Sequence, residues 1–138
     1  MCEGVYFTVN GRESRFYFQN PGAALPVRNK RTGALELVPW GRRPKQSGTL
    51  PLGGSVRVEL IRAGRWDKFF PKSVLIAARA FGLRDFEGQL RWYDLVPGQW
   101  LHGAYLCEGT EQRVYILTLE PDLPEVPHPL WPKVISHT

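Results

Sequence analysis

The chain has 138 residues, of which 43% are hydrophobic and 22% are charged, which is typical of a folded globular domain and excludes wholesale disorder. No apolar run approaches the 18 or so residues that cross a bilayer, and the N-terminal residues lack the basic and apolar regions of a signal peptide. We therefore expect one domain over residues 1–138, located in the cytoplasm.

The charge balance favours a polyanionic partner. The net charge is +5, and arginine outnumbers lysine by thirteen to five. Guanidinium groups bind phosphate bidentately and stack on rings, which favours contacts with nucleic acid. A basic protein without such a partner is an equal alternative on charge alone.

The two cysteines, Cys2 and Cys107, predict free thiols, and the three histidines lack metal-ligand spacing, so we expect no metal and no cofactor.

Twelve prolines and fourteen glycines predict many short elements and no long helix. The first half of the chain contains two predicted hairpins, a loop and a strand. Asn10-Gly11 suits a two-residue type I′ turn between the first two strands. The predicted segments are a hairpin of 4–9 with 15–19, a second hairpin of 24–28 with 34–39, a loop over 42–54 and a strand over 55–61.

The second half continues the β pattern. Residues 75–81 predict a strand or a short helix, because the segment is rich in alanine. Three further strands are predicted over 89–95, 100–108 and 114–119, and the tail over 121–132 has five prolines, which prevent a long regular element. The predicted fold class is α+β, mainly β, with a partly closed sheet.

Cys2 carries the most specific chemistry. If Met1 is removed, which a small second residue permits, Cys2 becomes a 1,2-aminothiol with an α-amine of pKa near 8. The amine condenses with an aldehyde to a Schiff base, and the thiol then closes a five-membered thiazolidine ring. A cysteine at this position by chance is the alternative.

Short motifs accompany Cys2 along the chain. They are Asn20-Pro21 with Leu25-Pro26-Val27, then Val38-Pro39-Trp40-Gly41, Ser55-Val56-Arg57-Val58-Glu59, Val74 to Arg84, and His128 with Pro132. In order and spacing they resemble the SRAP family (SOS-response-associated peptidases, or abasic site processing proteins), in a short, phage-related form. Family members open with M-C-G-R and carry M-R-W-G-L-I-P, N-A-R-x-E-T, C-L-I-P-A-x-G-F-Y-E-W and H-D-R-M-P-V-I-L.

The resemblance implies a bifurcated or barrel-like sheet flanked by few helices, self-removal of Met1, and covalent capture of abasic sites in single-stranded DNA. We further expect a monomer that is associated with the nucleoid when it is bound to DNA. The implied catalytic residues are Cys2, His128, Arg57 and Glu59. The implied DNA-binding residues are Trp40, Arg42, Arg43, Lys45, Ser55 and Arg57. Each has an ordinary alternative: a loop histidine, a surface Arg57–Glu59 pair, a core tryptophan and a solvated basic loop.

One departure bears on the chemistry. The family's glutamate falls on Leu83, and leucine transfers no proton. Asp85 and Glu87 lie near Leu83 in sequence. They replace the family's carboxylate only if the local loop differs from that of the family. With leucine in place of the glutamate, the reaction is slower, or the protein keeps the DNA-binding surface and has lost the reaction. Two rival functions stay open: a non-catalytic nucleic-acid- or protein-binding protein on the same fold, and a small-molecule hydrolase using Cys2 with His128.

Overall fold

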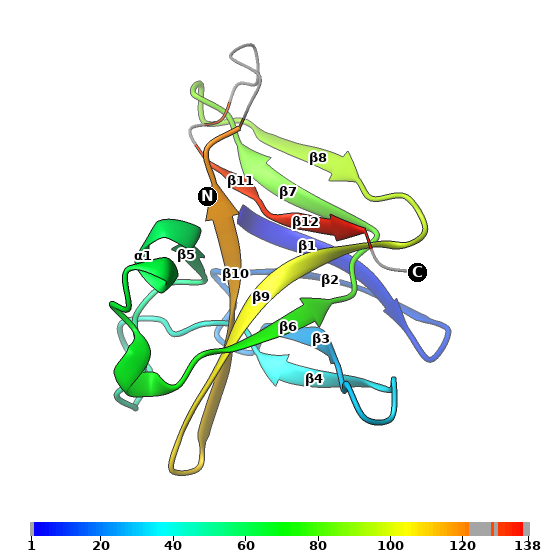
Figure 1. Cartoon of the computed structure of the whole chain (residues 1–138). Coiled ribbons are helices and arrows are strands. Elements are labelled where there is room, and N and C mark those ends of the chain that lie inside the picture. Colours follow the sequence, from blue (N-terminus) through cyan, green and yellow to red (C-terminus); the bar gives the residue numbers. More distant parts are fainter. Residues whose placement is uncertain (1, 122–127, 129, 137–138) are drawn as a thin grey trace.

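The computed structural model describes residues 2–121, 128 and 130–136, and it is mainly β (Figure 1). Helical structure in this part of the chain is limited to one five-residue α-helix and one 3-10 turn. The elements are β1 Cys2–Val9, β2 Arg12–Tyr17, β3 Ala24–Arg28, β4 Leu35–Pro39, β5 Ser55–Arg57, α1 Val58–Arg62, η1 Asp67–Phe69, β6 Lys72–Ile76, β7 Ala80–Arg84, β8 Leu90–Asp94, β9 Gln99–Glu108, β10 Glu111–Leu119, β11 Trp131–Pro132 and β12 Val134–Ser136.

The strands form two sheets that share a core. The smaller sheet has the order β2-β1-β7-β8, and the larger has the order β11-β10-β9-β6-β3-β4, with β12 beside β9 and β5 beside β10. The first core cluster takes Val5 and Phe81 from the smaller sheet and Leu25 and Leu101 from the larger one. The two sheets therefore pack against each other. A second cluster, which includes Tyr115, lies in the larger sheet with Ile61 of α1 packed against it.

The C-terminal segment enters the larger sheet between two diverging strands. β9 and β10 pair from Glu111↔Glu108 to Ile116↔Gly103. Beyond that point β11 pairs with the end of β10, and β12 pairs with the start of β9. The backbone of Lys133 bonds to both strands, accepting from His102 N and donating to Leu117 O, each at 2.8 Å. This insertion fixes the backbone from Trp131 to Ser136.

Most of the predicted elements are confirmed. In the first hairpin, Asn10 and Gly11 have φ of 53° and 76°, as a type I′ turn requires. The second hairpin pairs β3 with β4 as expected, and β8, β9 and β10 lie within or around their predicted segments.

Two predictions need correction. The strand predicted over 55–61 ends at Arg57, and Val58 to Arg62 is helical. Val58 and Ile61 are three residues apart, so they lie on one face of the helix, and this face packs in the second core cluster. The helix alternative for 75–81 is wrong, because this segment spans the end of β6 and the start of β7. In the tail, 122–127 and 129 lie outside the described residues.

The loop over 42–54 is held by a buried Arg113 on β10. Its guanidinium donates to Gly41 O at 2.9 Å and Ser47 O at 3.1 Å, and pairs with Glu111 at 2.7 Å. Glu111 also accepts from Thr49 N at 2.9 Å. The loop backbone therefore bonds to charged side chains of the sheet instead of to water, which explains why a segment without regular structure is ordered.

Trp40 anchors the same loop from the core side. Its side chain is fully buried, it donates from Nε1 to Gly54 O at 2.9 Å, and its ring lies edge-on to Phe18 at 5.4 Å between centroids. A Cβ at Gly54 would lie 2.7 Å from the Phe18 ring, so only glycine fits at that position.

We predict that Trp40→Ala lowers the free energy of unfolding by about 3–5 kcal/mol, because it removes a buried ring and leaves a cavity. Leu37→Ala, at a residue that is 55% exposed, is the control and should change stability by less than about 0.5 kcal/mol. Urea denaturation followed by tryptophan fluorescence measures both. Equal effects of the two variants would show that Trp40 is not a core residue.

Candidate functional site

The Cys2 thiol is enclosed at the start of β1. The residue is 2% exposed, and Sγ lies 3.4 Å from Gly4 O, to which it donates. Burial raises the pKa of the Cys2 thiol to about 12. At neutral pH the group is therefore a protonated thiol, and it becomes a strong nucleophile only when it is deprotonated, which exposure to water would favour.

His128 is also buried, at 2% exposure. Its Nδ1 lies 2.9 Å from Arg84 O, and its Nε2 lies 2.7 Å from the Tyr93 hydroxyl. A carbonyl only accepts hydrogen bonds, so Nδ1 carries the proton. In the neutral ring, Nε2 then accepts from Tyr93. The ring is further enclosed by Trp131, at 5.9 Å between centroids. His128 lies outside helices and strands, as the loop-residue alternative predicts, but it is buried and both of its ring nitrogens have hydrogen-bond partners.

Cys2 and His128 meet consecutive residues of β7. The backbone of Cys2 pairs with Leu83, and His128 bonds to the carbonyl of Arg84. Cys2 belongs to the first core cluster, against which Tyr93 and Trp131 also pack. Residues 126 positions apart in the chain are thus gathered at one end of the smaller sheet. Tyr93 was not predicted as a site residue, and its place in the strand predicted over 89–95 is the signal that could have found it.

The carboxylate expected near the thiol is missing from β7. Leu83 is fully buried beside Cys2. Asp85 does not replace it, because its carboxylate accepts from Glu87 N and Gln89 N at 2.9 Å and pairs with Arg91 at 2.7 Å. These bonds close the β7–β8 turn and lower the pKa of Asp85, chiefly through Arg91. Glu87 is exposed on that turn.

The carboxylate that does adjoin Cys2 is its neighbour Glu3. Glu3 pairs with Arg84 at 2.5 Å, and its charge acts to raise the Cys2 pKa. The pairing shifts register between Cys2 and Gly4, which marks a bulge at Glu3. Glu3 therefore supplies a negative charge that acts on the thiol, whereas the sequence pattern predicted a carboxylate at or near position 83.

The Ser55–Glu59 segment lies on β5 and α1, next to β10. Arg57 pairs with Glu59 at 3.8 Å and with Glu120 at 3.2 Å, and both partners are largely exposed. The surface-pair alternative for Arg57 is therefore confirmed, with Glu120 as an added partner. Ser55 Oγ is buried without a hydrogen-bond partner among the described residues.

The arginines predicted to bind phosphate donate their hydrogen bonds to backbone carbonyls of the protein. Arg43 is buried and donates to Phe18 O at 2.6 Å and Trp40 O at 2.7 Å. Arg42 donates to Gln46 O and Leu50 O. Base stacking by Trp40 is excluded in this conformation, because its ring is fully buried. Of this predicted set, Lys45 is exposed and has no side-chain partner among the described residues.

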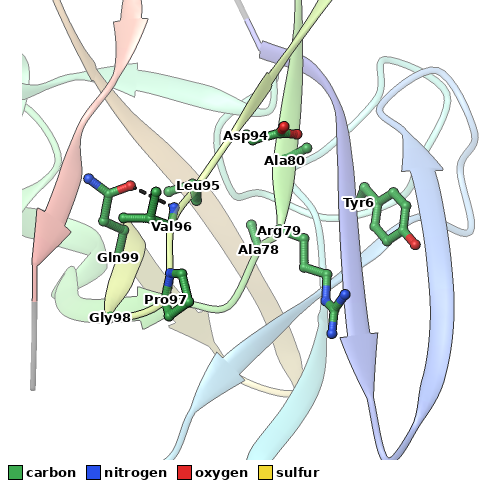
Figure 2. A pocket seen from close by; sticks show the side chains of 10 residues that line it. All are labelled: Tyr6, Ala78, Arg79, Ala80, Asp94, Leu95, Val96, Pro97, Gly98 and Gln99. Carbon is green, nitrogen blue, oxygen red and sulfur yellow. Dashed lines mark hydrogen bonds between the residues drawn. The ribbon is translucent and has the colours of Figure 1, made fainter.

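A pocket lies elsewhere on the smaller sheet, and Figure 2 shows its lining. It has a volume of about 650 Å³ and is formed by Tyr6 of β1, residues 78–80 before and at the start of β7, and residues 94–99 of the β8–β9 turn. In Figure 2 the Arg79 guanidinium extends between Tyr6 and Pro97. Neither Cys2 nor His128 lines it, and Arg79 and Asp94 give it mixed charge.

A second cleft of about 650 Å³ opens between β3 and β6 and was not predicted. Its lining includes four cations, Arg28, Lys30, Arg31 and Lys72, and no carboxylate. The signal in the sequence is three cations within the four residues 28–31 at a hairpin turn.

The described residues lack two features that mark other classes of protein. None of their helices is long and apolar enough to cross a membrane. No three of their His, Cys, Asp or Glu side chains are grouped so as to hold a metal ion.

We predict that Cys2 reacts with a disulfide reagent only through opening of the fold. The Cys107→Ser variant, with Cys2 as its thiol, should react about 100-fold or more slowly than the Cys2→Ala variant, whose Cys107 is exposed. Because the Cys2 pKa is raised to about 12, its rate should still rise with pH above pH 9, where an ordinary thiol of pKa about 8.5 levels off. Absorbance of the released thiolate measures both, and equal native rates contradict the buried site.

Comparisons with known proteins assign no family to this chain. No family model, no curated protein and no solved structure matches it. The functional inference therefore rests on the chain's own residues and their geometry.

Proposed function

We propose that this chain is an SRAP-like protein that binds single-stranded DNA and captures abasic sites through Cys2 after removal of Met1. The observation that supports the proposal is that Cys2 and His128 contact consecutive residues of β7, Leu83 and Arg84. The two residues are far apart in sequence, and both are the ones that the motif pattern selects. The net charge of +5 suits a DNA ligand.

The proposed reaction balances without a cofactor. An abasic site is a hemiacetal in equilibrium with an open aldehyde. The free α-amine of Cys2 adds to the aldehyde carbon and loses one water to form an imine. Sγ then adds to the imine carbon, the thiol proton passes to the imine nitrogen, and the thiazolidine ring closes. Because burial keeps the thiol protonated, Sγ must lose this proton as it adds to the imine carbon, and sulfur carries no charge in the product.

His128 is proposed to move protons during imine formation. In the neutral ring its Nε2 accepts from the Tyr93 hydroxyl, so a proton reaches the imidazole through Tyr93 or after this bond opens. Leu83 supplies none of this chemistry. We propose that Glu3, the next residue in the chain, accepts a proton from the amine, which requires that its ion pair with Arg84 opens.

The second candidate is a non-catalytic nucleic-acid-binding protein on the same fold. It is favoured by the burial of Cys2 together with Leu83, since an aldehyde on DNA reaches the thiol only after the start of β1 opens. The two candidates share the DNA-binding step and differ in the covalent one.

We predict that single-stranded DNA with one abasic site gives a denaturation-resistant adduct on gels. Cys2→Ala should abolish it, because the ring needs the thiol, whereas Cys2→Ser should leave at most a reversible imine. His128→Ala should slow formation by roughly 100-fold, and Tyr93→Phe should slow it less, if His128 moves protons. DNA without an abasic site is the control. A wild-type protein that binds DNA and forms no adduct selects the non-catalytic candidate.

Leu83→Glu tests the missing carboxylate, and we expect it to speed adduct formation. Because Leu83 is fully buried, a charge there costs stability, so Leu83→Gln is the matched variant for folding. Far-UV circular dichroism checks that both remain folded. An unchanged adduct rate in a folded Leu83→Glu protein would show that the carboxylate is not the limiting group.

A further inference from the structure

The cleft between β3 and β6 exists because the two strands part soon after they meet. They pair at Val27↔Ile76, and β3 then runs into the hairpin turn that leads to β4 (Figure 1). Asn29 shapes this turn, since its Oδ1 accepts from Arg31 N at 2.9 Å and from Thr32 N at 3.1 Å. The turn holds Lys30 and Arg31 at the cleft, opposite Lys72 at the start of β6.

The four cations of the cleft, Arg28, Lys30, Arg31 and Lys72, have no ion-pair partner among the described residues. The acid on the neighbouring strand, Glu36, accepts from Asn29 Nδ2 at 3.1 Å, and it does not line the cleft, although its charge acts on Tyr105, which does. Elsewhere in the described chain, Arg57, Arg84, Arg91 and Arg113 each pair with a carboxylate. The cleft therefore has a strong local excess of positive charge, which attracts an anion.

Neutral hydrogen-bonding groups and a ring adjoin these cations. Ser73 lines the cleft, and its hydroxyl lies 2.5 Å from Nε2 of His102 on β9. Burial and the charges of Lys133 and Lys30 lower the pKa of His102, so the ring stays neutral at pH 7. The Arg28 guanidinium lies over the Trp100 ring, 5.8 Å from its centroid.

We infer that this cleft holds the phosphate backbone of single-stranded nucleic acid, with a base stacked at Trp100 beside Arg28. Cations that follow a backbone, next to an aromatic ring that stacks with any base, are the features of grooves that bind single strands without sequence preference. The inference rests on the proposed DNA binding, and it places the strand on Arg28, Lys30, Arg31 and Lys72 instead of on Arg42 and Arg43, which serve the fold.

The test compares two double charge reversals in the full chain. Lys30→Glu/Arg31→Glu changes the cleft, and Arg62→Glu/Arg65→Glu changes exposed residues at and after the end of α1. Both variants lower the net charge from +5 to +1. Binding of a labelled oligothymidine is measured by fluorescence anisotropy over a series of salt concentrations, and circular dichroism checks folding. Lys72→Glu is a second cleft variant on a different strand.

We expect the cleft double variant to weaken binding about tenfold or more and the α1 variant less than about threefold. The slope of log K against log salt should become shallower by about 0.7 for each phosphate that the variant no longer neutralises. Trp100→Ala should weaken binding roughly tenfold with the salt slope unchanged, because stacking releases no counterions.

Three outcomes would overturn the inference. Equal weakening by the two double variants would mean that only net charge matters. Wild-type affinity in the cleft variants would place the strand elsewhere, while the proposed DNA binding stands. No binding of the wild-type protein at about 50 mM salt would remove the proposed function itself, and the inference with it.

Discussion

The pairing of β1 with β7 is the constraint on which the candidate site depends. It places Cys2 against Leu83 in the shared core, and it brings Arg84 to the position where its carbonyl accepts from His128. The same pairing buries the thiol and raises its pKa. One strand, β7, thus contacts both residues, and both side chains are buried. Any chemistry at Cys2 must therefore include an opening step at the start of β1.

The second constraint is the insertion of the C-terminal segment between β9 and β10. Lys133 bonds to both strands, so the segment from Leu130 to Ser136 is held in the larger sheet while His128 contacts the smaller one. The C-terminal segment therefore links the two sheets. Loss of this insertion would release His128 from Tyr93 and Arg84, and would expose the aromatic side of the core.

The hairpins were predictable because their turn chemistry is local. Asn10-Gly11 dictates positive φ angles whatever the rest of the chain does. The helix after Arg57 was missed because an alternating strand and an amphipathic turn look alike over seven residues. The cytoplasmic location and the monomeric state stay predictions.

At the site, sequence reasoning selected Cys2 and His128, but it gave other roles to residues that build the fold. Trp40, Arg42 and Arg43 have the composition of a nucleic-acid contact, and composition does not reveal that their polar groups bond to nearby carbonyl oxygens. The cations of the β3–β6 cleft come from two segments about 40 residues apart. Only the three-dimensional structure brings Lys72 to Arg31.

The most direct measurement is the mass of the Cys2 peptide after reaction with abasic single-stranded DNA and nuclease digestion. Covalent capture predicts a peptide that lacks Met1 and has gained the sugar fragment minus one water, with the mass increase located on Cys2. A peptide that retains Met1, or that lacks Met1 and stays unmodified after DNA has bound, would contradict covalent capture.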